Sequence, residues 1–173
     1  KVYDCTGCQL VPDLARKVIA EINEIDNFSM VKTINKQKAK ENNLLEYIGE
    51  DIDSKYIDTM VETLPKTELA NESGNELNII YTPLHGSAYK LTERLLSELG
   101  FSNLSIVEKQ AVFDPDFSTV ESPNPEEYSA FEMALEMAED NNDETDLIMG
   151  TDPDGDRMGA IVKDDKGNYI GLN

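Results

Sequence analysis

The chain has 173 residues, of which 39% are hydrophobic and 29% are charged, as in a folded domain of ordinary size. Its 35 acidic and 15 basic residues give a net charge of −20, which repels phosphate backbones and anionic lipid, so we expect neither nucleic acid nor a membrane surface as a partner. Its apolar stretches are too short to span a bilayer. Because the first residue is not Met, we expect a piece of a longer protein.

Cys5 and Cys8 are the only cysteines and have a Cys-x-x-Cys spacing. A zinc site needs four ligands, and the only histidine, His85, lies far along the chain. No other feature supports redox chemistry, so we interpret both cysteines as ordinary thiols. So few cysteines indicate a reducing compartment, and we expect the protein in the cytoplasm.

The first half of the chain predicts two helices. Residues 12–25 carry apolar side chains at helical spacing behind a proline, and residues 54–64 repeat this pattern with Ser54 as N-cap. The lysine-rich residues 28–43 between them are interpreted as a linker, and residues 66–76 as a polar loop. We expect residues 1–25 to be the tail of a preceding domain and residues 26–173 to be the domain proper.

From Leu77 onward, predicted strands alternate with predicted helices. The helix expected over residues 88–99 ends at Gly100, and another begins with Asn124 as N-cap and Glu127 completing a capping box. The predicted strands are 77–82, 104–107, 146–150 and 158–162, the last pairing with a further strand through a turn at 165–168. This alternation predicts an α/β fold, a three-layer α/β/α sandwich around a mixed, mainly parallel sheet with an antiparallel edge.

The most informative segment reads Thr-Asp-Pro-Asp-Gly-Asp-Arg, residues 151–157, and lies between two predicted strands. Its proline fixes φ and its glycine allows a positive φ, so the backbone can curl and bring Asp152, Asp154 and Asp156 together. Carboxylate oxygens are the ligands that a hard divalent cation prefers. Arg157 beside them can bind a phosphate through two hydrogen bonds. The loop therefore predicts a site for a metal-bound phosphate.

Two simpler interpretations of this loop are a calcium-binding EF-hand and an acidic turn without a ligand. An EF-hand calcium loop also begins Asp-x-Asp-x-Asp, but it requires Gly at position six and Glu at position twelve, where this chain has Arg157 and Lys163. An acidic turn without a ligand is the other possibility. Three carboxylates so close in sequence repel one another, which favours a bound cation.

Two further segments lie next to predicted strands or helices. Residues 82–87 join a strand to a helix, at the edge where α/β proteins bind ligands, and they contain His85. We interpret His85 as a hydrogen-bonded structural residue rather than a catalytic one. Residues 122–125, Ser-Pro-Asn-Pro, are explained by helix capping alone.

Together these segments resemble the α-D-phosphohexomutases, the phosphoglucomutase and phosphomannomutase superfamily, and most of all the bacterial phosphoglucomutases. Residues 151–157 resemble the family's metal-binding loop, Asp-x-Asp-x-Asp-Arg. Residues 7–12, Gly-Cys-Gln-Leu-Val-Pro, resemble the segment that closes its first domain, and residues 82–86 and 122–126 resemble two loops of its second domain. The resemblance covers nearly the whole chain, as the end of domain I followed by domain II.

The resemblance implies an intramolecular phosphotransferase, in which a phosphoserine of the first domain exchanges its phosphoryl group with a hexose phosphate through a bisphosphorylated sugar. It implies Mg²⁺ as cofactor, with Asp152, Asp154 and Asp156 as ligands and Arg157 in contact with the phosphoryl group. The family's serine loop, sugar-recognition loop and phosphate-binding domain have no counterpart in this sequence, so we expect activity only with the remaining domains. Cys8 stands where the family pattern has glycine.

Two alternatives stay open beside this interpretation. A non-catalytic acidic module could use the same three aspartates to bind a divalent cation. A different metal-dependent phosphotransferase could use an aspartate of the loop as its nucleophile. The hexose, whether glucose, mannose or an amino sugar, is also left open.

Overall fold

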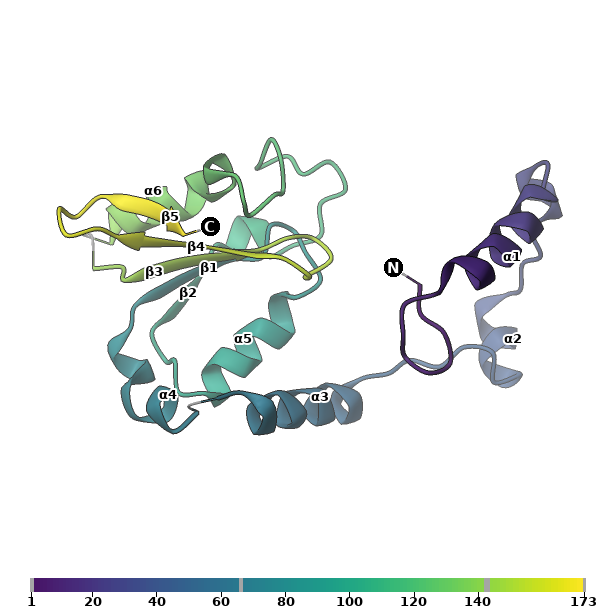
Figure 1. Cartoon of the computed structure of the whole chain (residues 1–173), viewed down its shortest axis with the longest axis horizontal. Helices are drawn as coiled ribbons and strands as arrows, with labels where there is room; N and C mark the ends of the chain where they lie inside the picture. The colour runs from purple at the N-terminus through teal and green to yellow at the C-terminus, as the bar shows by residue number, and fades with distance from the viewer. Residues whose placement is uncertain (1, 66, 142–143, 173) are drawn as a thin grey trace. The chain divides into compact units, whose positions relative to one another are not determined.

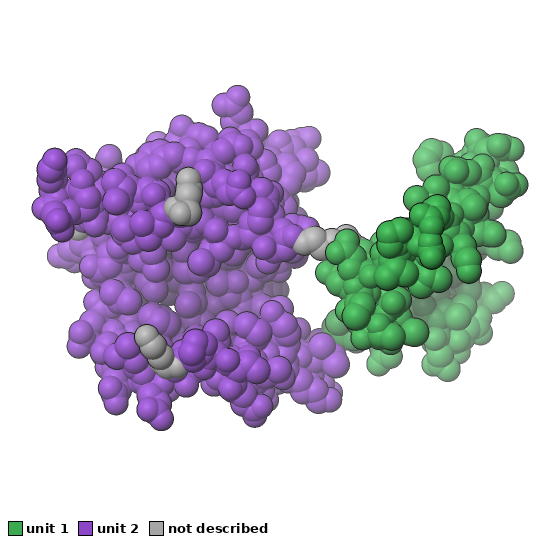
Figure 2. All heavy atoms as spheres, viewed as in Figure 1, with its two compact units in different colours: residues 1–48 green, residues 49–173 purple. Residues whose placement is uncertain are grey.

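The computed structural model describes residues 2–65, 67–141 and 144–172. They form two compact units, Lys1–Ile48 and Gly49–Asn173, coloured separately in Figure 2. The division falls later in the chain than the boundary expected after residue 25. That the first residues are the tail of a preceding domain stays a prediction.

The first unit holds two helices and a short helical turn. α1 spans Pro12–Asn23, η1 Phe28–Met30 and α2 Lys36–Glu41, so the segment interpreted as a linker is partly helical. The apolar side chains that predicted α1 are exposed, with exposed fractions of 40% at Leu14 and 56% at Ile22. Tyr3 forms a single bridge with Gln9 rather than the strand end expected over residues 1–4, of which Lys1 lies outside the described residues.

Five strands of the second unit form one mixed sheet in the order β2-β1-β3-β4-β5 (Figure 1). β1 (Ile79–Thr82) is parallel to β2 (Leu104–Ile106) and to β3 (Leu147–Thr151). β4 (Met158–Lys163) and β5 (Tyr169–Leu172) continue the sheet in antiparallel fashion. The α/β class and the mixed sheet are confirmed, with as many antiparallel as parallel neighbour pairs among the described strands.

Helices cover both faces of this sheet. Alternate residues of each strand point to opposite sides, so both faces carry apolar side chains that must be buried. On one face α6 (Glu132–Asp140) packs its Ala134 and Ala138 against Ile80 and Ile148. On the other face α5 (Tyr89–Glu98) packs against Tyr81 and its neighbours. Figure 1 shows α6 above the sheet and α5 below it, so the three-layer arrangement is confirmed.

α3 (Glu50–Thr63) lies outside α5 and buries Ile57 completely, while Arg94 of α5 pairs with Glu50 at 2.7 Å. The predicted cap was wrong: Gly49 precedes the first turn, and Ser54 lies inside the helix. The Ser54 hydroxyl donates to the Glu50 carboxylate one turn earlier in the same helix.

The prediction of a polar loop over residues 66–76 was also wrong for residues 67–76, which the structure describes. α4 (Thr67–Ser73) and η2 (Gly74–Glu76) occupy it. Glu68, Leu69 and Ala70 are strong helix formers. A Cβ added at Gly74 would lie 3.0 Å from the backbone of Gly100, so this turn fits tightly against the end of α5, a contact between segments distant in sequence.

The helix expected from Asn124 begins later than predicted. η4 (Tyr128–Phe131) comes first and α6 starts at Glu132, so Asn124 caps neither element. Tyr128, expected in the buried stripe, is 51% exposed, whereas Phe131 is buried as expected. Within the described residues no helix has both the length and the apolar character needed to cross a membrane.

Candidate metal centre

The carboxyl ends of β1 and β3 lie next to each other in the sheet, because these strands are parallel neighbours. From β1 the chain passes through α5 to β2 on one side and returns to β3 on the other side of β1. In open α/β sheets such a reversal opens a crevice where ligands bind. The segment after β1, residues 83–87, and the segment after β3, residues 152–157, both begin there.

These two segments touch through their backbones. The Ser87 N–H donates to the Pro153 carbonyl at 3.0 Å, and the Ser87 hydroxyl donates to the same oxygen at 3.2 Å. A Cβ at Gly86 would lie 2.8 Å from the Asp152 carbonyl oxygen, closer than real side chains approach. Glycine at position 86 therefore permits the contact that fixes the two loops against each other.

The loop after β3 curls as the sequence predicts. The Gly155 N–H donates to the Asp152 carbonyl at 3.0 Å, and Gly155 has a φ of +73° that favours glycine. Each of Asp152, Asp154 and Asp156 contributes one carboxylate oxygen to a cluster in which these atoms lie within 4.8 Å of one another. Asp152 is buried, whereas Asp154 and Asp156 are exposed. One end of the cluster is thus fixed in the protein and the other faces solvent.

Asp152 is fixed through both of its carboxylate oxygens. Its Oδ1 accepts from the backbone N–H groups of Asp156 and Arg157, each at 3.0 Å, and its Oδ2 accepts from Nε of Arg157 at 2.9 Å. Burial alone would raise the pKa of Asp152, but the hydrogen bonds from the backbone and side chain of Arg157 outweigh it and hold the pKa below its ordinary value. Asp152 is therefore ionised at neutral pH, as a metal ligand must be.

Arg157 connects this loop to the segment before η4. Its Nη1 donates to Oδ1 of Asn124 at 2.9 Å and lies 3.8 Å from a carboxylate oxygen of Glu126. The carboxylate of Asp152 raises the pKa of Arg157, so the guanidinium stays charged. Sequence reasoning missed Asn124 and Glu126 at this site. The unusual Ser-Pro-Asn-Pro-Glu segment was visible, but its link to Arg157 exists only in the folded chain.

His85 lies at the same edge of the sheet and is 5% exposed. Its Nδ1 lies 2.8 Å from the Val112 carbonyl, which can only accept, and its Nε2 lies 2.7 Å from the Thr119 hydroxyl. Gln110, also buried, continues this network by donating to the Thr119 hydroxyl and accepting from the Thr82 hydroxyl. With both ring nitrogens engaged, His85 ties the long segment after β2 to the end of β1, in agreement with the structural interpretation.

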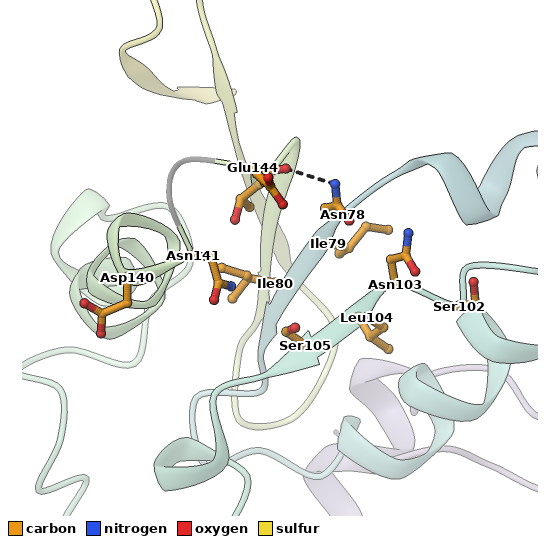
Figure 3. A pocket seen from close by; sticks show the side chains of 11 residues that line it. Asn78, Ile79, Ile80, Ser102, Asn103, Leu104, Ser105, Asp140, Asn141 and Glu144 are labelled. Carbon is orange, nitrogen blue, oxygen red and sulfur yellow. Dashed lines mark hydrogen bonds between the residues drawn. The ribbon is translucent and has the colours of Figure 1, made fainter.

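A pocket of about 550 Å³ lies away from this cluster, at the amino ends of the parallel strands (Figure 3). Asn78 and Asn103 line it, and the Asn78 amide donates to the Glu144 carbonyl at 3.0 Å. A smaller pocket of about 290 Å³ adjoins the metal loop, with Ser87, Asp154 and Gly155 in its wall. The three carboxylates thus gather at the carboxyl edge of the sheet, beside the smaller pocket.

A family model described as "Phosphoglucomutase/phosphomannomutase, alpha/beta/alpha domain II" matches residues 54–167, well over half of the chain. The chain belongs to this family. Its match to the second domain agrees with the three-layer fold, and the superfamily inferred from the sequence motifs is confirmed.

Curated relatives match nearly the whole chain. A phosphomannomutase of Mycoplasmoides pirum is 35% identical over 94% of the chain, and a phosphoglucomutase of Staphylococcus haemolyticus is 35% identical over 99%. A phosphoglucomutase of Staphylococcus aureus is 34% identical over the whole chain. The chain spans only 28 to 30% of the length of these curated relatives.

The donor set of the cluster fits a small hard cation. All three candidate ligands are carboxylate oxygens, which suit Mg²⁺ better than the nitrogen and sulfur donors that favour zinc. Octahedral Mg²⁺ holds neighbouring oxygens roughly 3 Å apart and opposite ones roughly 4 Å apart.

Proposed function

We propose that this chain is the metal-binding domain of a phosphohexomutase that interconverts glucose 1-phosphate and glucose 6-phosphate, or the corresponding mannose phosphates. The reaction runs through a phosphoserine on another domain and a bisphosphorylated sugar. One observation carries the proposal: a cluster of three carboxylates with an arginine beside it, at the carboxyl edge of the sheet, in a chain of this family.

Asp152, Asp154 and Asp156 hold Mg²⁺, and Arg157 contacts the phosphoryl group. When bound, the cation neutralises charge on the phosphoryl oxygens, and phosphoryl transfer is catalysed mainly by such positioning and neutralisation. Asp152 anchors the site because its carboxylate is held by three N–H groups. Gly86 has no side chain, so its backbone can pack directly against that of Asp152 and keep the cluster in place.

The hexose phosphate and the remaining domains of the full-length enzyme are the partners of this domain. By itself the domain is inactive, because the phosphoserine that exchanges the phosphoryl group belongs to the first domain. A reducing compartment such as the cytoplasm fits a chain with only two cysteines.

The decisive experiment uses the full-length protein and measures conversion of glucose 1-phosphate to glucose 6-phosphate with Mg²⁺ and a trace of the 1,6-bisphosphate. Mannose 1-phosphate is tested in parallel. We expect turnover that EDTA abolishes and that Asp154→Asn lowers by roughly 100-fold or more. Asp165→Asn removes an equally exposed acidic residue from the β4–β5 hairpin and should leave the rate unchanged.

Three results would contradict the proposal. Full activity of Asp154→Asn, or no turnover with any hexose phosphate, would favour a non-catalytic cation-binding module. A phosphoryl label recovered on Asp152 instead of a serine would identify a different phosphotransferase.

A further inference from the structure

We propose that Asn124 is a positioning residue for Arg157, which it holds at the angle needed to meet a phosphoryl group. The inference rests on the proposed function, in which Arg157 contacts that group. It assigns a role to the Ser-Pro-Asn-Pro-Glu segment, which helix capping does not explain because neither η4 nor α6 begins at Asn124.

The contacts of Arg157 fix the plane of its guanidinium group. Nε donates to Asp152 at 2.9 Å and Nη1 donates to Asn124 at 2.9 Å, so two different nitrogens are held by two separate segments. The side chain is 45% exposed, and an arginine held only at Nε can still turn about its Nε–Cζ bond, which exchanges the two Nη groups. Asn124 therefore removes a freedom of movement that Asp152 alone leaves.

The orientation of Asn124 is determined by its neighbours. Its Nδ2 donates to the Glu127 carboxylate at 3.0 Å, while its Oδ1 accepts from Arg157. Oδ1 faces two donors, Nη1 of Arg157 and, at 3.2 Å, the N–H of Glu126. Turning the amide over would break both contacts, so the orientation is kept even without Glu127.

The backbone at this position is fixed by the sheet. A Cβ added at Gly159 of β4 would lie 2.0 Å from the Pro125 carbonyl oxygen, so the segment rests directly on the strand that follows the metal loop. Pro125 is buried there. Asn124 and Arg157 thus come from two segments that share one rigid support.

The charge of the holding group also fits this role. Asp152 and Glu126 already place two carboxylates beside Arg157, with Glu126 at 3.8 Å. An amide oxygen at position 124 accepts the hydrogen bond without a third negative charge. A third carboxylate would repel the phosphoryl group that Arg157 is proposed to contact.

The first test is NMR of the Arg157 side chain in the 173-residue chain, where slow rotation about the Nε–Cζ bond keeps the Nη1 and Nη2 resonances separate. We expect these resonances to be separate in the wild type and to merge in Asn124→Ala. Asn124→Asp keeps an acceptor oxygen and should keep them separate. Glu127→Ala removes the other partner of Asn124 but no contact of Arg157, and should also leave them separate.

The second test is kinetics of the full-length enzyme with the same variants. Loss of the correct arginine angle should lower kcat by roughly 10- to 100-fold in Asn124→Ala. Asn124→Asp should retain most of kcat and raise KM, because the arginine stays placed while the added charge weakens phosphate binding. Glu127→Ala should change neither by more than about twofold.

Merged resonances in wild type, or unchanged resonances in Asn124→Ala, would overturn the proposal, as would an equal effect of Glu127→Ala. Merged resonances in Asn124→Ala with an unchanged kcat would overturn the catalytic importance of the positioning. A full-length protein without any mutase activity would refute the proposed function instead, while the NMR comparison would still decide whether Asn124 holds Arg157.

Discussion

The three aspartates of the metal loop have identical side chains but different physical roles. Asp152 is 2% exposed and accepts three hydrogen bonds, whereas Asp154 and Asp156 are exposed. When a buried carboxylate is removed, its hydrogen-bond donors are left without an acceptor. When an exposed carboxylate is removed, water can take its place as the acceptor. The loop therefore depends on Asp152 for its own structure as well as for the proposed cation site.

Asp152→Asn should lower the free energy of unfolding of the metal-free chain by about 2 kcal/mol, because the new amide group must face either Arg157 or a backbone N–H, all of which are donors. Asp154→Asn should leave it unchanged or slightly raise it, since a repelling charge is removed. Urea unfolding of both variants without divalent cations measures the difference. Equal losses in the two variants would contradict the anchoring role of Asp152.

The pH dependence follows from the lowered pKa of Asp152. A carboxyl whose pKa is lower in the folded state contributes stability above its unfolded pKa of about 4, and loses it as the pH falls through the folded value. The difference between wild type and Asp152→Asn should thus be the same at pH 8 and pH 5, and shrink below about pH 4. A difference that already shrinks between pH 8 and pH 5 would show a raised pKa.

Among the elements, β3 and β4 illustrate how small residues position the site. Gly150 of β3 and Gly159 of β4 are paired in the sheet, and the Phe131 ring lies over both. A Cβ at Gly150 would lie 2.8 Å from this ring. The two glycines therefore create the shallow surface on which η4 and the segment before it rest.

Gly159→Ala should destabilise the chain by about 2 kcal/mol or more, because the new methyl group collides with the Pro125 carbonyl and its backbone must move. Gly171→Ala on the neighbouring strand β5 is a matched control, since nothing lies within 4 Å of its added Cβ. Thermal unfolding of both variants measures the contrast. A tolerated Gly159→Ala would show that the segment does not rest on β4.

At the scale of the whole molecule, the buried apolar clusters belong to the second unit. One cluster surrounds Ile80, Phe131 and Ile148, and the other surrounds Tyr81 and Met149. In the first unit Ala39 is buried, whereas the apolar side chains of α1 are exposed. The hydrophobic contribution to folding is thus concentrated in residues 49–173.

Residues 49–173 should fold without the first unit, because both clusters and all five strands lie within them. We expect a cooperative urea transition whose midpoint lies within about 0.3 M of that of the whole chain. Circular dichroism of the two forms provides the comparison. A truncated chain that is unfolded, or that unfolds gradually, would show that residues 1–48 contribute to the core.

Much of this protein follows from its sequence alone. The alternation of apolar segments with helix and turn signals determined the α/β class, the strands and the β4–β5 hairpin, because those patterns are local. The spacing of the three aspartates, with proline and glycine between them, determined the curl that gathers their oxygens. Helix ends were less predictable: Ser54 and Asn124 are good caps by residue type, but packing placed both elsewhere.

Only the tertiary structure decided which distant groups meet at the loop. Asn124 reaches Arg157 because its segment rests on Gly159, and Gln110 and Thr119 reach His85 because the segment after β2 folds back over β1. Such contacts join residues with no fixed spacing in the chain, so no local sequence pattern predicts them. Buried polar groups such as His85 and Gln110 must find partners, and only the packed sheet determines which partners are within reach.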